Sequence, residues 1–299
     1  MPDYSELKKK FGQYCLFDEP AGNFTTYRAG GKAEVLVKPG CVADIVWLGA
    51  WCRRQALPMR TLGRGSNVLV SDKGLPGVTV LTERLYALLY SGNSIKVQAG
   101  ALWDNFVYAS AQQGLGGLQK TSGIPGSVGG ALRMNAGAYG QEVFDRLVSV
   151  QALDAACKEV ELKKKDIPHG YRRTEGLQDL ILISAVFELD PGPPDVMLLD
   201  RHNILSLRAE KQPLDSPSAG SVFKRPAGDY ASRLIDAAGL KGLRVGGAQV
   251  SPKHAGFIVN AGGATAADIY SLIGKVRAEV KAKTGISLEL EQILLGEFN

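Results

Sequence analysis

The fold is decided by one glycine-rich stretch, Gly123-Ile124-Pro125-Gly126-Ser127-Val128-Gly129-Gly130-Ala131, and its continuation Met134-Asn135-Ala136-Gly137-Ala138-Tyr139-Gly140. Nine of the 27 residues from Gly114 to Gly140 are glycine, whereas the whole chain has 36 glycines in 299 residues. Apolar residues are interleaved with these glycines, which is not typical of a low-complexity linker. Backbone without side chains lets amide groups approach a ligand closely, so the stretch predicts a cradle for a diphosphate.

A second glycine loop, Gly63-Arg64-Gly65-Ser66-Asn67, lies further towards the N-terminus. Neither loop matches the P-loop pattern or the dinucleotide pattern G-x-G-x-x-G. Tight turns are one interpretation of both loops. The other is a pair of loops from successive subdomains that hold a dinucleotide, with polar contacts from Ser66, Asn67 and Asn135.

Hydrophobic periodicity around these loops predicts a mixture of strands and helices. We expect strands at 33–37, 59–62, 68–70, 78–81, 88–90, 95–97, 147–153, 159–162, 180–189, 256–259 and 286–295, and helices at 42–56, 101–113, 197–211, 230–238 and 266–283. Helices and strands that occur in mixed runs predict an α+β fold with two or three subdomains. The best candidate boundary is Pro191-Gly192-Pro193-Pro194.

Composition excludes several classes of protein. The net charge of +5 is too mild for a nucleic-acid ligand, but it is compatible with an anionic small molecule. No run of 18 apolar residues predicts a membrane span, and the N-terminus has no signal-peptide pattern. The cysteines form no C-x-x-C pair and the three histidines lack metal-ligand spacing, so we expect a metal-free protein of the reducing cytoplasm.

Three further clusters carry residues suited to chemistry. They are Tyr171-Arg172, the block Ala219-Gly220-Ser221-Val222-Phe223-Lys224-Arg225, and Glu289-Leu290-Glu291 in the last predicted strand. An arginine fork suits a carboxylate or a phosphate. Each cluster also has an ordinary interpretation: a surface pair, a strand start followed by surface cations, and a solvent-facing strand edge.

Together these pieces resemble the UDP-N-acetylenolpyruvoylglucosamine reductase family, from about Asn23 to Glu291. Besides the stretches quoted above, the resemblance is carried by Asn23-Phe24-Thr25-Thr26-Tyr27-Arg28-Ala29-Gly30-Gly31, by Leu62 to Leu69 and by Lys253-His254-Ala255-Gly256-Phe257. The short segment between Arg172 and Ser221 is similar to the compact type of this family. That type lacks an insertion with a substrate-covering tyrosine, so the residue that covers the substrate here stays open.

The resemblance implies a fold and a reaction. The fold is the FAD-binding fold of p-cresol-methylhydroxylase type in two subdomains, 1–82 and 83–191, with the flavin-binding region at about 27–191. A substrate domain follows at 192–299, and its last strand returns to the active site. The reaction is NADPH-dependent reduction of enolpyruvyl-UDP-N-acetylglucosamine to UDP-N-acetylmuramate through non-covalently bound FAD, for peptidoglycan synthesis. We expect a monomer or weak oligomer without nucleic-acid or membrane partners.

The resemblance also implies roles for individual residues. Ser221 is the expected proton donor, and Arg172 and Glu291 complete the catalytic set. The expected FAD contacts are Gly63, Arg64, Gly65, Ser66, Asn67, Gly123, Ile124, Pro125, Gly126, Ser127, Gly130, Asn135 and Gly137. The expected substrate contacts are Tyr171, Lys224, Arg225 and Lys253, and no metal is expected. Two residues depart from the family pattern: Gln119 replaces a frequent glutamate, and Arg225 replaces the asparagine of the longer type.

Two other functions stay open at this stage. One is a flavin oxidoreductase of a small alcohol or sugar on the same fold. Such enzymes often attach FAD through histidine, and neither glycine loop contains a histidine. The other is a non-catalytic flavin- or nucleotide-binding module, which would be expected to lack one of Arg172, Ser221 and Glu291.

Overall fold

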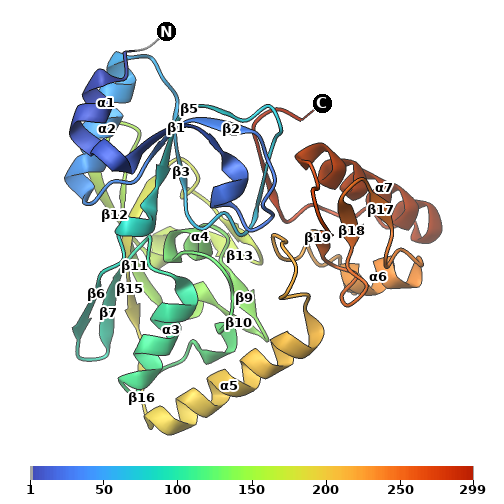
Figure 1. Ribbon diagram of the computed structural model, residues 1–299. Coiled ribbons are helices and arrows are strands. Elements are labelled where there is room, and N and C mark those ends of the chain that lie inside the picture. The colour runs from blue at the N-terminus through green and yellow to red at the C-terminus, as the bar shows by residue number, and fades with distance from the viewer. Residues whose placement is uncertain (1–2, 299) are drawn as a thin grey trace. The chain divides into compact units, whose positions relative to one another are not determined.

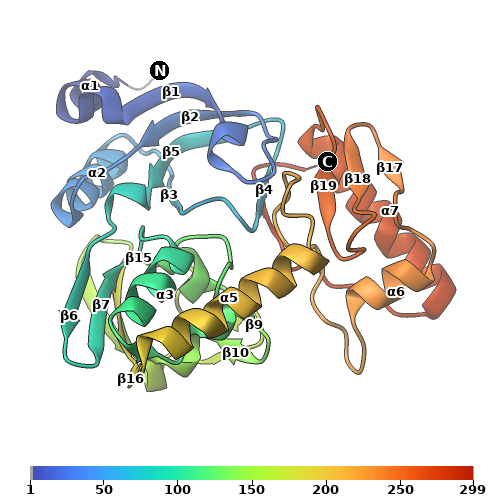
Figure 2. The ribbon, with the colours of Figure 1, turned by 60° about the horizontal axis from the view of Figure 1, so that its bottom comes forward.

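The computed structural model describes residues 3–298, and Figures 1 and 2 label its elements. The chain divides into two compact units that are discontinuous in sequence. The first unit consists of the N-terminal residues up to Leu16, Val35–Arg64 and Gly77–Arg208. The second consists of Phe17–Glu34, Gly65–Pro76 and the residues from Ala209 onward.

The N-terminal part of the chain forms a four-stranded sheet with two helices. The strand order is β1 (Cys15–Pro20), β2 (Lys32–Val37), β5 (Leu75–Leu81) and β3 (Met59–Leu62), and β3 pairs with β5 in parallel. The helices are α1 (Ser5–Phe11) and α2 (Val42–Arg54). The helix predicted at 42–56 is confirmed as α2, and Ile45, Leu48 and Cys52 on one of its faces are buried.

The larger sheet of the first unit is antiparallel throughout. Its order is β12 (Glu159–Lys163), β11 (Leu147–Leu153), β15 (Ile181–Glu188), β7 (Ser94–Gln98) and β6 (Leu88–Ser91). Helix α3 (Trp103–Gln112) contributes Trp103 and Phe106, whose rings lie 5.8 and 5.2 Å from the ring of Phe187. These buried rings build the core of this unit on one face of the sheet, next to the predicted glycine-rich stretch.

Short elements complete the first unit. The two-stranded pairs are β8 (Leu115–Gly116) with β16 (Asp190–Pro191), β9 (Gly137–Ala138) with β10 (Gln141–Glu142), and β13 (His169–Gly170) with β14 (Arg173–Thr174). Helix α4 (Val128–Arg133) is capped by Ser127, the residue before its first turn. The Ser127 hydroxyl accepts the amide N–H of Gly130. Single 3₁₀ turns lie at Gly12–Tyr14, Ala21–Phe24, Thr82–Arg84, Gln119–Thr121, Val143–Asp145 and Lys164–Asp166.

Helix α5 (Pro194–Lys211) follows the proline-rich boundary segment, and most of it packs with the first unit (Figure 2). Arg201 of α5 forms an ion pair with Asp104 of α3 at 2.5 Å, and Met197 is buried. The contact division therefore falls after Arg208, whereas the sequence places a domain boundary at 191/192. The subdomain division predicted at 82/83 also differs from the two compact units, because each unit takes several separate segments of the chain.

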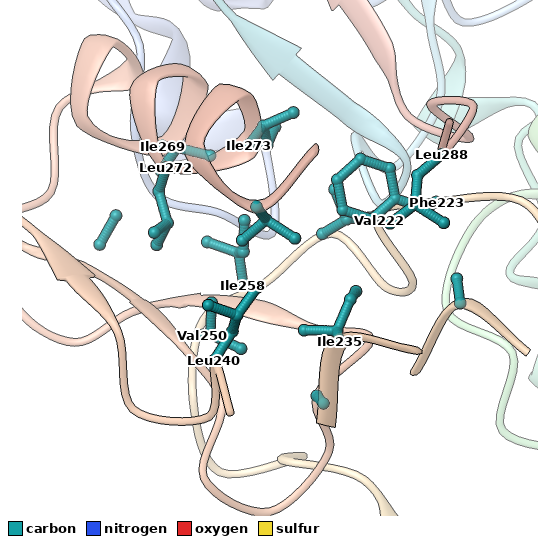
Figure 3. Packing of buried hydrophobic residues seen from close by; sticks show 14 of the residues in the cluster. Val222, Phe223, Ile235, Leu240, Val250, Ile258, Ile269, Leu272, Ile273 and Leu288 are labelled. Carbon is teal, nitrogen blue, oxygen red and sulfur yellow. The ribbon is translucent and has the colours of Figure 1, made fainter. Parts of the chain in front are cut away.

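The second unit has a core built on helix α7 (Ala266–Thr284), as Figure 3 shows. This helix was predicted at 266–283, and its apolar residues at helical spacing are buried: Ile269, Leu272, Ile273, Val276 and Val280. The helix packs with α6 (Ala231–Ala237) and with the sheet β17 (Arg244–Val245), β18 (Ala248–Val250) and β19 (Ile258–Asn260). Val222 and Phe223 are buried in the same cluster, so the predicted serine block is anchored in this core.

One predicted strand of the second unit is wrong in its extent. We expect a strand over 286–295, but β20 covers only Ile293–Leu295 and pairs in parallel with β4 (Val68–Val70). The preceding residues instead meet the serine block, through a bridge between Phe223 and Leu290. The alternating pattern therefore comprises two short extended segments with different partners.

Candidate active site

The two predicted glycine loops come into contact within the first unit. A Cβ atom built at Gly63 would lie 2.2 Å from the Ser127 hydroxyl oxygen, so a side chain there would displace this hydroxyl. The same hydroxyl accepts the Gly130 amide at 3.2 Å and so caps α4. Gly63, Ser127 and Gly130, predicted separately from the sequence, therefore form one arrangement.

Most amides of the 123–131 segment already have protein acceptors. The Gly123 N–H donates to Asp104 Oδ1 at 2.7 Å, and the Val128 and Gly129 amides donate to the carbonyls of Ala101 and Ala99 at 2.8 Å. Ile124 donates to the Thr121 carbonyl at 3.3 Å. Fewer N–H groups are therefore left for a ligand than the glycine content suggests, and several glycines serve close packing instead.

Buried polar atoms without partners surround Gly123. Within residues 3–298, no hydrogen-bond partner is present for the Ser122 hydroxyl, Arg201 Nε or Arg208 Nε. A Cβ atom at Gly123 would lie 3.0 Å from Arg208 Nε. Burial lowers the pKa of Arg208, although Asp104 and Tyr139 act in the opposite direction. Unsatisfied cationic donors beside a glycine loop fit an anionic cofactor such as FAD, because burying them otherwise costs free energy.

Arg172 occupies a strained position in the first unit. It is the second residue of the two-residue turn between β13 and β14, with φ of 54°, a region that favours glycine. Its guanidinium donates to the carbonyls of Gly137 at 2.6 Å and Asn135 at 3.4 Å. It also lies 4.9 Å from the ring centroid of Tyr171, a half-exposed side chain. The predicted pair Tyr171-Arg172 is thus joined to the second half of the glycine-rich stretch.

Asn135 is the buried link between these segments. Its Nδ2 donates to Glu142 Oε2 at 2.6 Å and to the Gly170 carbonyl at 3.1 Å, and its Oδ1 accepts the Phe144 amide at 3.1 Å. Asn135 itself has φ of 39° and is fully buried. Its amide group is therefore engaged in holding the turn that carries Arg172.

Ser221 and Glu291 both belong to the second unit, where adjacent backbones hold them. Ser221 forms a bridge with Phe257. The Glu291 amide donates to the Val222 carbonyl at 2.9 Å, and Lys224 donates to the Glu289 carbonyl at 2.8 Å. The segments 221–224 and 289–291 therefore run antiparallel. Ser221 is exposed and Glu291 is half-buried, so both are open to a ligand.

Gln292 is a positioning residue that sequence reasoning missed. Its Nε2 donates to the Ala219 carbonyl at 3.0 Å, and its Oε1 accepts the Tyr27 hydroxyl at 3.0 Å. Burial raises the pKa of Tyr27, which stays a neutral donor. A glutamine next to a predicted catalytic glutamate gives no distinctive pattern in a single sequence. Arg208 and Ser122 were missed for the same reason.

The other predicted residues lie in several places. In the second unit, Asn67 Nδ2 donates to the Glu291 carbonyl at 3.2 Å, and Gly65 packs so closely that a Cβ would lie 2.4 Å from the Phe24 carbonyl. Lys224 pairs with Glu289 at 2.5 Å, Arg225 lies 4.5 Å from the Tyr230 ring centroid, and Lys253 donates to the Ala209 carbonyl at 2.6 Å. In the first unit, Arg64 is exposed, Ile124 packs at the core, and Pro125, Gly126 and Gly137 belong to the loop segments described above.

Two kinds of feature are absent from residues 3–298. Between residues 3 and 298, no helix combines the length and the apolar character that crossing a bilayer requires. Over the same range, no group of three or more histidine, cysteine, aspartate or glutamate side chains has an arrangement that could hold a metal ion.

Profiles of two families match the chain. The profile of an FAD binding domain matches residues 33–163, and the profile of the UDP-N-acetylenolpyruvoylglucosamine reductase C-terminal domain matches residues 212–295. The first match confirms the expected flavin-binding fold. It covers the α4 and Asn135 segments together with Gly63.

Whole proteins are also similar over nearly their full lengths. UDP-N-acetylenolpyruvoylglucosamine reductase of Lactococcus lactis subsp. cremoris is 41% identical over 283 residues, 94% of both chains. The reductase of Alkalilimnicola ehrlichii is 43% identical over 93% of this chain and 94% of its own. The crystal structure of UDP-N-acetylenolpyruvylglucosamine reductase from Thermus caldophilus has a TM-score of 0.81 and 33% identity, covering 94% of this chain and 98% of its own. By this similarity, the chain belongs to the UDP-N-acetylenolpyruvoylglucosamine reductase family.

Proposed function

We propose that Arg172, Ser221 and Glu291 carry the chemistry of this reductase family in the present chain. The chain is an FAD-dependent oxidoreductase that uses NADPH to reduce enolpyruvyl-UDP-N-acetylglucosamine to UDP-N-acetylmuramate, a step of peptidoglycan precursor synthesis. Identity of about 40% to named reductases over nearly the whole chain carries this assignment. The two alternatives, a different flavin oxidoreductase and a non-catalytic module, have no comparable support.

Bound FAD would supply the two-electron transfer from NADPH to C3 of the enolpyruvyl group. The residues of the chain then have to stabilise negative charge that develops towards the substrate carboxylate. Arg172 offers a guanidinium held at two carbonyls, and a fork of this kind binds a carboxylate through charge-assisted hydrogen bonds. It therefore orients the substrate and stabilises its enolate character.

Ser221 donates the proton to C2 in this proposal. A serine is a weak acid, so it acts only against a strongly basic carbon and away from bulk water. Its backbone is held by the β-bridge to Phe257. The side-chain amide of Gln292 also donates to the carbonyls of the two residues before the serine, Ala219 and Gly220. Glu291, held through its amide at Val222, would carry or share a proton so that it does not repel the enolate.

The remaining roles concern binding. We assign FAD contacts to the two glycine loops, with Arg208 beside Gly123 as an additional anion-binding group. Lys224, Arg225 and Lys253 are the proposed contacts to the UDP diphosphate, and Tyr171 is the proposed neighbour of the substrate at Arg172. The net charge of +5 supports binding of a small anionic ligand rather than a nucleic acid. We further propose that the protein is a monomer or weak oligomer in the cytoplasm.

The proton-donor role is tested with Ser221→Ala. We expect NADPH to bleach the FAD absorbance of this variant at the normal rate, since the serine takes no part in that half-reaction. Turnover with the enolpyruvyl substrate falls by roughly 10²–10⁴, the usual effect of removing a positioned acid. Stopped-flow absorbance of the two half-reactions measures both rates.

Ser218→Ala, in the same turn-rich segment, is the matched control and keeps full turnover. If the enolpyruvyl substrate reoxidises Ser221→Ala at the wild-type rate, Ser221 is not the proton donor. A protein that purifies without bound flavin, or that is reoxidised by small alcohol-derived substrates instead, would contradict the function itself.

A further inference from the structure

Two cysteines of the first unit lie at one face of α2. Cys52 is on the helix and 2% exposed, whereas Cys157 is in the loop between β11 and β12 and 7% exposed. A Cβ atom built at Gly49 would lie 2.2 Å from the Cys157 sulfur, so this sulfur rests on the Gly49 backbone. Because Gly49 and Cys52 are three positions apart on one helical face, the two thiols are neighbours.

The loop holds Cys157 in an unusual conformation. Cys157 has φ of 59°, at the hairpin position that glycine normally occupies. Its amide donates to the Asp154 carbonyl at 2.8 Å, and Asp154 Oδ1 accepts the amides of Ala156 and Lys158 at 2.8 and 2.9 Å. The turn is therefore well formed, and its strained residue directs a sulfur onto the helix.

Two local preferences are broken at the same contact. Glycine lowers the stability of a helix interior, and Gly49 lies in the middle of α2. A residue with a Cβ is disfavoured at positive φ, and Cys157 has that conformation. Exchanging the two residue types would satisfy both preferences, and positions that break local preferences in this way are candidates for a functional role.

The surroundings give the two thiols different properties. Arg53 Nη1 lies 3.5 Å from the Cys157 sulfur and 3.1 Å from the Ala155 carbonyl. Burial, together with the neighbouring Cys157, raises the pKa of Cys52 to about 11. Cys157 is the more exposed of the two cysteines and lies in the surface loop beside Arg53, so it is placed to meet an oxidant first and Cys52 to respond second.

We propose that Cys52 and Cys157 form a hydroperoxide-sensitive dithiol that closes to a disulfide. The Cys157 sulfur attacks the terminal peroxide oxygen, the O–O bond breaks, and a sulfenic acid and an alcohol form, or water when the oxidant is hydrogen peroxide. The Cys52 sulfur then displaces the hydroxyl group, the S–S bond forms, and water leaves. Overall, two thiols give up two protons and two electrons, and one peroxide is reduced.

Cys157 lies close to the molecular surface. It keeps 7% of its surface exposed, and Ala155, Ala156 and Lys158 beside it in the loop are exposed. Cys15 and Cys41 differ from this pair. Cys41 is exposed and Cys15 is buried, and neither has a second thiol or an arginine at its sulfur among the described contacts of residues 3–298.

The test treats the FAD-bound full-length protein with hydrogen peroxide, alkylates free thiols and maps peptides by mass spectrometry without reduction. We expect a linked peptide pair that contains Cys52 and Cys157, loss of two of the four thiols to alkylation, and full reversal by dithiothreitol. The double variant Cys15→Ser with Cys41→Ser is the matched control and gives the same linked pair. Cys157 oxidised to sulfinic acid without linkage, or linkage through Cys41, overturns the proposal.

Cys157→Gly provides a second test. Glycine adopts the positive φ of this turn without strain, so the substitution should not disturb folding. We expect this variant to fold, to bind FAD and to show no change in Tm on oxidation, whereas oxidised wild-type protein melts at a higher temperature than its reduced form. An equal rise in Tm for Cys157→Gly would show that oxidation acts elsewhere.

Discussion

At the scale of single residues, strain is concentrated around Arg172. Asn135, Tyr139 and Arg172 have φ values of 39°, 51° and 54°, and hydrogen bonds join Arg172 to the backbone of Asn135. A non-glycine residue in this region costs about 1–2 kcal/mol. Such conformations persist where surrounding bonds fix them, and they are frequent at functional sites. The buried amide of Asn135 is the group that fixes this one.

Replacing Arg172 by lysine tests whether the fork itself is needed. Lysine keeps the positive charge but presents a single ammonium, so it cannot hold a carboxylate bidentately. We expect kcat to fall by roughly 10²–10³, as for loss of one donor to a developing oxyanion. Steady-state kinetics with the enolpyruvyl substrate measure the change.

Arg173→Lys is the control for Arg172→Lys, because Arg173 is exposed and pairs with Glu175. Its kcat stays at the wild-type value. Similar losses in both variants would mean that the turn, and not the Arg172 fork, responds to substitution.

Residue types with a distinctive pattern could be predicted, and single polar residues could not. Gly63, Ser127 and Arg172 lie in recognisable motifs, and the structure places them in joined arrangements. Gln292 and Arg208 act through tertiary contacts across long sequence separations, which one sequence does not reveal.

At the scale of elements, long periodic segments were predictable and short ones were not. Helix α7 lies within two residues of its predicted range, has both hydrogen bonds of a capping box and ends at Gly285 with φ of 74°. Helix α4 was missed because two adjacent glycines argue against a helix, yet the Ser127 cap and close packing at Ala99 stabilise it. The strand over 286–295 was predicted too long because alternation cannot show a change of partner.

Loss of the α7 cap has a measurable cost. Thr265 accepts the Asp268 amide at 3.0 Å, and Thr265→Ala removes that acceptor. We expect the free energy of unfolding to fall by about 1 kcal/mol, with the helix otherwise intact. Urea denaturation followed by circular dichroism gives the value.

Ser271→Ala, on the exposed face in the middle of α7, controls for the loss of a hydroxyl group. It leaves stability unchanged or slightly higher, because alanine is the better helix former. Asp72 also accepts the amides of Ala266 and Ala267 at 2.9 and 2.8 Å. An unchanged urea midpoint for Thr265→Ala would mean that the hydrogen bonds from Asp72 are enough to stabilise the N-terminus of α7.

At the scale of the whole molecule, we expect stability to depend on pH through His254. Its Nδ1 accepts the Gly256 amide at 3.1 Å, and its ring lies 4.9 Å from that of Phe257. Burial is the main cause that lowers the pKa of His254 below 6.5. The folded protein therefore keeps a neutral imidazole at pH values where the unfolded chain binds a proton.

The sign of the pH effect follows from proton uptake. As pH falls below about 6.5, the unfolded state gains a proton that the folded state does not, so the free energy of unfolding decreases. The decrease stops below the folded pKa. We expect His254→Gln to lose this decrease in the free energy of unfolding, which denaturant titrations between pH 8 and pH 5 measure. In wild-type protein the decrease begins near the pKa of a free histidine, ~6.5.

His202→Gln is the matched control, because His202 is exposed on α5. It retains the wild-type pH profile. A slope that is the same in His254→Gln and wild-type protein would assign the effect to other groups.

The second unit is assembled from three separated stretches of chain, and this limits how the gene can be recombined. β20 pairs with β4, Gln292 binds the Tyr27 hydroxyl, and Asp72 holds the first turn of α7. A chimera made by one crossover near residue 209 would join a C-terminal region from one parent to Tyr27, β4 and Asp72 from the other. Functional hybrids of two relatives therefore require all three stretches to be inherited together.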